Sequence, residues 1–313
     1  MPNQSNHSPG FRRTISLRLP VALTAAWILA AAAGVRADPF TAIDYPGAVF
    51  TQAFGLNDLG DVVGRWDDAG GTAHGFLLHR GQFTSIDPPG STFTVAHDVN
   101  NFVTVVGRYF DADDVPRGFI WKNGAFTIVD YPGAVDTRLR GIDDFGRISG
   151  NFTMEDGHEH GFIRDAWGFR QIDYPDSDSS DVWDTNIFGV RVGDWSDTND
   201  VVYGFVLRNG RFTNLNFPGA LDTSLRGINP QGEIVGVYDT EDGTLHGALK
   251  TRSGWISFDY PGSSDTVGNR INVLGHVVGF YIDGAGDTHG FLWKRRTGHG
   301  ARVDAVAGNE DED

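Results

Sequence analysis

A period of 43 residues runs through this chain from Phe40 onward without a single insertion or deletion. One column of the repeat precedes a turn that is aromatic-Pro-Gly in four of the six copies, and it reads Asp44, Asp87, Asp130, Asp173, Asn216 and Asp259. A second column precedes a glycine, which is followed by Phe in five of the six copies, and it reads His74, Arg117, His160, Tyr203, His246 and His289. Self-similarity at 20–50 residues is typical of solenoids, propellers and repeat arrays. Most recurring residues are therefore expected to serve the architecture.

Each unit contains four strand-like segments separated by turn signals. In the first unit the segments are Phe40–Asp44, Thr51–Leu56, Asp61–Trp66 and His74–Leu78. Tyr45-Pro46-Gly47 between the first two has the Pro and Gly positions of a type II turn. The third segment carries a glycine and, two residues later, an aromatic residue in all six copies, which predicts rings packed over bare backbone between neighbouring sheets.

Six such units predict an all-β fold, a six-bladed β-propeller with four-stranded blades. The repeats begin with the first segment at Phe40 and end with the fourth at Trp293. The N-terminal strand is therefore expected to complete the last blade and close the ring. The alternative is an open β-solenoid, which would need capping units at its ends.

Both ends of the chain differ from the repeats. Residues 1–37 combine Arg12, Arg13 and Arg18 with an apolar stretch, and Val35-Arg36-Ala37 offers a signal-peptidase site, so they predict a cleaved signal peptide. A membrane anchor is the alternative interpretation of this segment. Residues 38–297 form the predicted propeller domain, and residues 298–313 an acidic, disordered tail. We expect an exported protein, either extracellular or periplasmic.

Charge and cysteine content restrict the partners. Removing residues 1–37 takes away four Arg and no acid, so the net charge falls from −16 to −20. This argues against nucleic acid and against anionic membrane surfaces, and no segment predicts membrane insertion of the mature chain. The chain has no cysteine, which excludes disulfides and thiol chemistry. We expect a monomer.

One family resemblance is visible in the repeat motif. The run Gly227-Ile228-Asn229, followed by Gly232, Gly236 and Tyr238 and by the His-Gly pair at 246–247, resembles the HAF-type extracellular repeats of bacteria. The resemblance covers residues 40–297, although this chain has His-Gly-Phe where the family has His-Ala-Phe. It implies extracellular placement and a repeat fold, and it transfers no catalytic residue.

The recurring His and Asp columns predict structural hydrogen bonds. The His column lies too far from the axis for its members to share a metal ion. The Asp column before Pro-Gly is interpreted as a turn stabiliser. Acidic loops such as Asp111–Asp114 and Asp239–Asp242 are expected to be solvated, with calcium binding in one of them as the alternative.

One column varies without a shared structural role. It immediately precedes the Gly-Ile-Asn cluster, on the second segment, which we expect to be innermost. A Trp beside several Arg in this column predicts a site for a polar or acidic carbohydrate at the channel mouth. The alternative is that the column varies because it is unconstrained. Its six members, the candidate ligand-binding residues, are Phe54, His97, Arg140, Trp183, Arg226 and Asn269.

These observations favour a secreted, non-enzymatic binding or interaction propeller for a carbohydrate or protein ligand. No catalytic motif is present, and no cofactor is predicted apart from the calcium alternative. The rival is a polysaccharide-acting hydrolase or lyase that uses Asp98 and Asp184 at the same mouth. A third interpretation is a calcium-dependent surface or matrix component.

Overall fold

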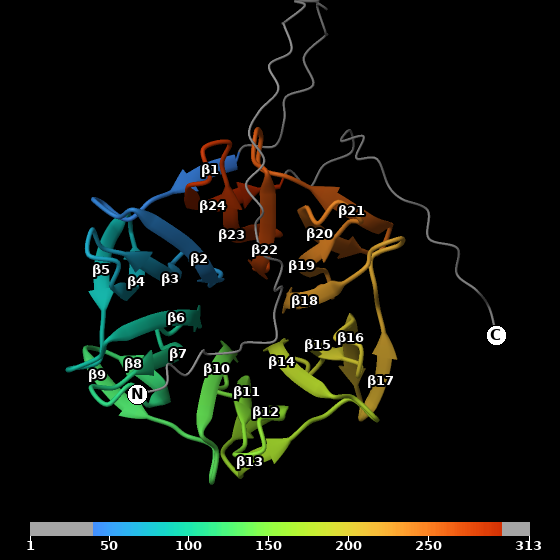
Figure 1. Ribbon diagram of the computed structural model, residues 1–313, viewed down its shortest axis with the longest axis horizontal. Helices are drawn as coiled ribbons and strands as arrows, with labels where there is room; N and C mark the ends of the chain where they lie inside the picture. Colours follow the sequence, from blue (N-terminus) through green and yellow to red (C-terminus); the bar gives the residue numbers. More distant parts are fainter. Residues whose placement is uncertain (1–39, 296–313) are drawn as a thin grey trace, which may run out of the picture. The chain divides into compact units, whose positions relative to one another are not determined.

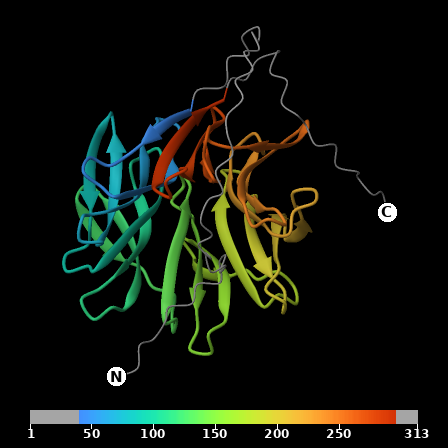
Figure 2. The ribbon, with the colours of Figure 1, turned by 45° about the horizontal axis from the view of Figure 1, so that its top comes forward.

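The computed structural model describes residues 40–295 as six four-stranded antiparallel sheets around one axis (Figure 1). The tilted view shows the sheets standing side by side like blades (Figure 2). The predicted six-bladed propeller is confirmed. The predicted signal peptide and acidic tail, 1–37 and 298–313, lie outside the described residues. No helix in the described part is long and apolar enough to cross a bilayer.

The innermost strands contact one another in sequence around the ring, and the last of them contacts the first. The second segment of each repeat is therefore innermost, as predicted. These strands are β2 (Phe50–Leu56), β6 (Phe93–Val99), β10 (Asp136–Ile142), β14 (Ser179–Thr185), β18 (Thr223–Ile228) and β22 (Asp265–Ile271).

Three further strands complete each blade outward. The second strands are β3 (Val62–Asp67), β7 (Val105–Phe110), β11 (Ile148–Thr153), β15 (Arg191–Ser196), β19 (Ile234–Asp239) and β23 (His276–Ile282). The third strands are β4 (Ala73–His79), β8 (Pro116–Lys122), β12 (Glu159–Asp165), β16 (Val202–Arg208), β20 (Leu245–Thr251) and β24 (Thr288–Lys294). The outermost strands are β5 (Gln82–Ile86), β9 (Ala125–Ile128), β13 (Gly168–Gln171), β17 (Arg211–Asn214), β21 (Gly254–Phe258) and β1 (Phe40–Ile43).

The N-terminal strand closes the ring. Strand β1 pairs antiparallel with β24, so that Phe40 lies opposite Trp293 and Ile43 opposite Gly290. The ring of Phe40 stacks on the indole of Trp293 with 5.4 Å between centroids. The last blade therefore takes its outermost strand from the start of the repeats. The closure prediction is confirmed, and the open-solenoid alternative is wrong.

The invariant glycine of the second strand is required by close backbone approach. A Cβ on Gly64 would lie 1.9 Å from the carbonyl oxygen of Gln52 and 2.7 Å from the ring of Phe76. Phe76 belongs to β4 of the same blade, so the expected packing between neighbouring sheets is wrong in this detail. In five of the six blades the aromatic residue two positions later stacks on the aromatic of the turn, as Trp66 does on Tyr45 at 4.0 Å. In the second blade Pro88 stands in place of the turn aromatic.

A belt of side-chain amides joins the blades around the axis. Asn57 Oδ1 accepts hydrogen bonds from the backbone N–H of Leu59 and Asp61, which closes the turn between β2 and β3. Asn57 Nδ2 donates to the carbonyl of Asn100 in the next blade at 3.1 Å. The same donation recurs from Asn100, Asn186 and Asn229. The bond from Asn272 to the Asn57 carbonyl, 3.1 Å, joins the last blade to the first. We call this ring the amide belt.

The third blade lacks the amide and uses a substitute. Asp143 stands in the Asn column and cannot donate. Arg147 pairs with the Asp143 carboxylate at 2.6 Å and donates to the carbonyls of Asn186 and Ile187 in the next blade. The belt is therefore continuous through all six blades.

The His and Asp columns bind each other, which agrees with the structural role predicted for the His column. His74 Nδ1 lies 3.1 Å from Asp87 Oδ2, while Asp87 Oδ1 accepts the N–H of Gly75. Arg117 takes the place of His in the second blade and pairs with Asp130 at 2.9 Å. The Asp column therefore binds the connection between the outermost strand and the next blade to the third strand. This differs from the predicted role, in which each Asp stabilises the turn that follows it.

Replacing Asn272 by Asp tests the amide belt. The variant keeps the oxygen that closes the turn but loses the donor that joins the last blade to the first. We expect the free energy of unfolding to fall by about 1–3 kcal/mol, because the Asn57 carbonyl loses its buried partner. Chemical denaturation measures the change. Asn123→Asp in an exposed hairpin is the control and should leave stability unchanged; an equal loss in both variants would contradict the belt.

Candidate functional site

Every innermost strand carries a β-bulge, and the extra residue is the one predicted as a site residue. In β2, Ala53 lies opposite Gly64 and Gly55 opposite Val63, which leaves Phe54 without a partner in β3. The same shift occurs in the other five blades. Bulges redirect a side chain and interrupt the ladder. The varying column thus coincides with a repeated irregularity of the backbone.

The structure brings the six bulged residues together in one layer around the axis, which we call the bulge layer. The rings of Phe54 and His97 meet edge to face at 5.3 Å. Arg226 Nη1 donates to Asn269 Oδ1 at 3.0 Å, and Asn269 Nδ2 donates to the Ala53 carbonyl. Neighbouring blades therefore supply side chains that contact one another across the channel.

Trp183 lies at the centre of the contacts on one side of the bulge layer. The guanidinium of Arg140 lies 4.0 Å from its ring centroid, and that of Arg226 lies 4.8 Å away. The indole N–H donates to Asp194 Oδ2 at 2.9 Å. A ligand that stacks on Trp183 must therefore displace a guanidinium.

A chain of buried charges adjoins the bulge layer in the second to fourth blades. Asp136 accepts from Arg108 and Arg138 at 3.0 and 2.9 Å. Arg138 also pairs with Glu159 at 2.6 Å, and Arg140 with Asp181 at 3.4 Å. We call Arg108, Asp136, Arg138, Glu159 and Asp181 the charged seam.

The sequence analysis did not single out most of the seam. A signal was present for Glu159, because its column elsewhere reads Ala73, Pro116, Val202, Leu245 and Thr288. A single charge in a column of neutral residues marks a departure from the repeat.

Burial shifts the pKa values of several groups here. Desolvation, with the nearby charge of Asp181, raises the pKa of Glu159 and that of Asp194 to about 7. Desolvation also lowers the pKa of Arg226 to about 10. Burial, followed by the charge of Arg140, holds the pKa of His97 well below its usual range, so His97 is neutral. Such perturbed groups are typical of functional sites.

Several buried polar atoms in this region have no hydrogen-bond partner in the described protein. They are His97 Nδ1, Arg108 Nε, Asp136 Oδ1 and Asp181 Oδ1. Buried polar groups are normally satisfied, and exceptions require an explanation. The bulge layer and the charged seam together therefore retain hydrogen-bonding capacity.

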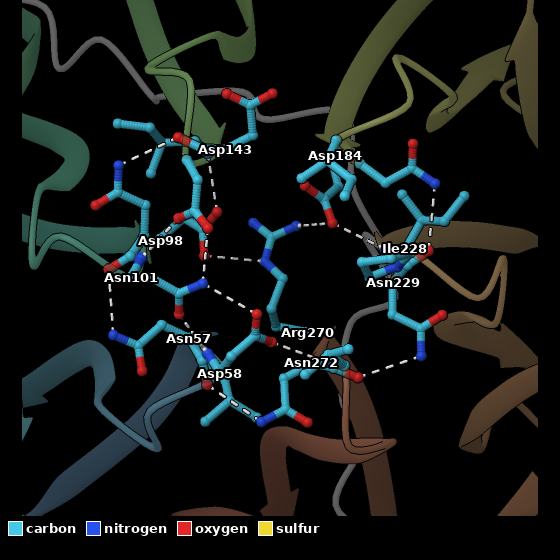
Figure 3. A pocket seen from close by; sticks show the side chains of 18 of the residues that line it. Asn57, Asp58, Asp98, Asn101, Asp143, Asp184, Ile228, Asn229, Arg270 and Asn272 are labelled. Atoms are coloured by element: carbon cyan, nitrogen blue, oxygen red, sulfur yellow. Dashed lines mark hydrogen bonds and ion pairs between the residues drawn. The ribbon is translucent and has the colours of Figure 1, made fainter.

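A central ion triad fills the channel next to the bulge layer (Figure 3). Arg270 lies between two carboxylates, 3.2 Å from Asp98 and 2.9 Å from Asp184. It also donates to the carbonyls of Arg226 and Arg140. The two carboxylates accept backbone N–H groups from neighbouring blades as well.

Glycine alternates with the triad members around the axis. The same column reads Gly55, Gly141 and Gly227 in the other three blades. A Cβ on Gly55 would lie 2.6 Å from the Cα of Asp98, so the channel is too narrow for six side chains at this level.

The triad accounts for the two carboxylates considered for catalysis. Asp98 and Asp184 share one guanidinium and are buried, and burial raises the pKa of Asp98 to about 7. They serve as structural partners of Arg270.

A shallow depression of about 90 Å³ lies above the triad, between the turns of the amide belt. Small-molecule pockets usually enclose roughly 300–1,000 Å³, so this depression is small for a buried ligand. Asp98, Asp184 and Arg270 contribute to its lining, but none of the six bulge-layer residues does. The candidate residues and this mouth are therefore separate regions.

The acidic loops use their carboxylates on their own backbone. Asp68 Oδ1 accepts the N–H groups of Gly70 and Thr72 at 2.8 and 2.9 Å. Asp111, Asp197 and Asp283 repeat this arrangement. No cluster of three or more potential metal ligands occurs among residues 40–295.

Comparison with known proteins shows the fold. No family model and no curated protein matches the sequence. AofleA from Arthrobotrys oligospora is 14% identical, with a TM-score of 0.53 over 83% of this chain and 87% of that chain. The SapL1 lectin in complex with alpha methyl fucoside is 13% identical, with a TM-score of 0.53 over 79% and 93%. TolB from Acinetobacter baumannii is 10% identical, with a TM-score of 0.50 over 76% and 64%.

Replacing Arg270 by Met tests the central ion triad. Two buried carboxylates would lose their counter-ion, so we expect the free energy of unfolding to fall by about 3–5 kcal/mol near neutral pH. Adding Asp98→Asn and Asp184→Asn to the variant should recover part of this loss. Denaturant unfolding measures all three proteins. Unchanged stability in the single variant would show that the ion pairs contribute nothing.

Asp194 predicts a dependence of stability on pH. Because its pKa is raised to about 7, the folded chain holds a proton there that the unfolded chain has released between about pH 4 and 7. The stability from this group therefore falls as pH rises through that window, by at most about 1.4 kcal/mol per pH unit.

Denaturant unfolding of the Asp194→Asn variant at a series of pH values measures this contribution. The variant should lose the part of the pH dependence of the unfolding free energy that Asp194 contributes. The difference in stability between the variant and the natural protein therefore varies with pH. Asp242→Asn is the control, because the pKa of Asp242 is lowered to about 2 by hydrogen bonds and titrates outside the window. Parallel profiles for the natural protein and the Asp194→Asn variant would contradict the assignment.

Proposed function

We propose that this propeller is a non-enzymatic binding protein whose ligand is a polar or acidic carbohydrate. The observation that carries the proposal is the set of buried, unpartnered polar atoms in the bulge layer and the charged seam, together with the two guanidiniums that lie against Trp183. Aromatic rings combined with fixed polar groups are the usual means of orienting such a ligand. The SapL1 lectin, whose structure holds a fucoside, has the same fold and supports this ligand class.

The charge balance favours an anionic ligand. Arg108, Arg138, Arg140 and Arg226 face the three carboxyl groups of the charged seam and that of Asp194, which accepts the indole N–H of Trp183. Two of these carboxyls, Glu159 and Asp194, have pKa values raised to about 7, so a proton on either leaves excess positive charge. Affinity for an acidic sugar should therefore increase as pH falls below neutrality.

A catalytic alternative would have to use other acids than Asp98 and Asp184. The raised pKa of Asp194, with Asp181 nearby, is the property of a general acid. Glycoside hydrolysis needs such an acid and a second carboxylate. Turnover is therefore one outcome of the test below.

The proposal also places the protein outside the cytoplasm. The predicted signal peptide and the resemblance to HAF-type repeats support export. A calcium-dependent surface component is distinguished by including a chelator in the binding assay.

Thermal unfolding against acidic and neutral oligosaccharides tests the function. A ligand at a hundred times its dissociation constant stabilises the folded state by about 2.7 kcal/mol. We expect this shift with an acidic sugar, greater at pH about 6 than at pH about 8. We expect its loss in Trp183→Ala, since the indole and its two guanidinium contacts are removed.

Trp167→Ala is the matched control, because Trp167 is an exposed Trp on an outer hairpin. It should retain the full shift. No shift with any sugar, or an equal shift in both Trp variants, would contradict a site in the bulge layer. Cleavage of a bound glycan that disappears in Asp194→Asn would favour the enzyme.

A further inference from the structure

The two faces of the propeller have opposite chemistry. Because all strands are antiparallel, connections alternate between the faces. One face, the acid face, carries the connections that lead from each outermost strand to the next blade and from each second strand to the third. Within the described residues these connections contain twenty Asp and Glu and no Lys or Arg. They include the loops at 111–115, 172–178 and 240–244.

The other face, which we call the turn face, carries the amide-belt turns and the hairpins between third and outermost strands. Its hairpins, with their flanking residues, place six exposed cationic side chains around the outer circumference. None of the six forms an ion pair within residues 40–295. They are Arg80, Lys122, Arg208, Arg211, Arg252 and Lys294.

The acidic groups of the turn face are engaged internally. Four of them pair with a His or Arg on the same face: Asp61 with His79, Asp143 with Arg147, Asp165 with Arg170 and Glu233 with Arg295. The other two, Asp58 and Asp144, line the depression near the axis and accept hydrogen bonds from Asn101. The cations of the hairpins therefore dominate the outer part of this face.

An apolar ring lies inside the basic circumference. The third turn position after the innermost strand holds a large apolar residue in five of six blades. These side chains are Leu59 (70% exposed), Phe102 (63%), Phe145 (75%), Phe188 (72%) and Leu274 (56%). Trp167, on the outer hairpin of the third blade, is 96% exposed on the same face. Contiguous apolar groups on a soluble surface mark an interaction site.

We propose that the turn face docks on the surface of an anionic lipid bilayer. Apolar side chains at the tips of the turns enter the boundary between headgroups and acyl chains, while the surrounding Lys and Arg contact anionic headgroups. Peripheral membrane binding combines these two terms. This surface is separate from the bulge layer and goes beyond the proposed carbohydrate site.

The composition and shape of the ring favour lipid over other partners. Leu59 and Leu274 are aliphatic and Phe102, Phe145 and Phe188 are aromatic, and Leu and Phe are the residue types that enter the boundary between headgroups and acyl chains. The apolar tips surround the depression above the ion triad. A fluid interface accommodates projecting tips around a hollow, whereas a rigid protein partner would need a matching protrusion.

The net charge of the whole chain gives no indication of this surface. The acidic excess of the whole chain argued against anionic membranes, but the acids gather on the far face. An innermost strand of seven residues spans roughly 20 Å, about two Debye lengths at physiological salt. The acid face is therefore screened from a membrane that contacts the turn face. It is repelled only when it approaches an anionic membrane itself, which disfavours the reverse orientation.

Co-sedimentation with vesicles tests the proposal. We expect the protein to bind phosphatidylcholine vesicles that contain about 30% phosphatidylglycerol, and to bind pure phosphatidylcholine much less. The triple variant Phe102→Ser, Phe145→Ser and Phe188→Ser should lose binding. Arg208→Gln with Arg211→Gln should weaken it by about fivefold for each charge removed. All these side chains are exposed, and circular dichroism checks that the variants fold.

The control is Val49→Ser with Val135→Ser, which removes exposed apolar groups from the acid face. It should bind vesicles as the natural protein does. Absence of binding to anionic vesicles, or equal loss in the control, would overturn the proposal. Concentration-dependent self-association without vesicles, abolished by the triple Phe variant, would overturn it in favour of a second copy as the occupant. Sugar binding measured on the same variants is expected to be unchanged, which separates this test from that of the carbohydrate site.

Discussion

The ring depends on one repeated interaction, the hydrogen bond from a side-chain amide of one blade to a backbone carbonyl of the next. The same Asn holds its own turn closed with its oxygen, so the turn and the spacing of the blades are set together. The bond from Asn272 to Asn57 applies that spacing to the junction of the two ends. Where Asp143 interrupts the series, Arg147 reaches the same carbonyl, which shows that the contact is required even when the residue type changes.

A ring of fixed spacing leaves a narrow channel, and the narrow channel dictates which residues can occupy it. Three glycines alternate with Asp98, Asp184 and Arg270 because a Cβ at Gly55 would meet the backbone of Asp98. The bulge before each of these positions turns one further side chain toward the axis. Charges in this space lose hydration, which raises carboxyl pKa values and makes pairing obligatory. Chemistry at the axis is therefore a consequence of the architecture.

The six-bladed fold and the closure of the ring could be predicted from the sequence, since the 43-residue period, the turn signals and the positions of Phe40 and Trp293 can all be seen in the sequence itself. The varying column also identified the bulge layer. Contacts between blades were not predictable, because the pairing of Arg270 with Asp98 and Asp184 depends on the channel diameter. The amide belt was not predicted either, because the donor and the acceptor of each of its hydrogen bonds belong to different blades. Net charge, a sum over the chain, hid the separation of acidic and basic faces that strand alternation produces.

Repetition and departure from it produce two kinds of surface in this molecule. A column that keeps one chemistry is copied around the axis, so a single choice at the third turn position becomes the apolar ring that includes Phe102, Phe145 and Phe188. Weak contacts of one kind then act together because the rigid ring presents them at once. A column that changes once, as at Glu159, creates an asymmetric feature inside the ring instead. The two proposed sites follow this division: the docking surface uses a repeated column, and the carbohydrate site uses positions at the axis, where the blades cease to be equivalent.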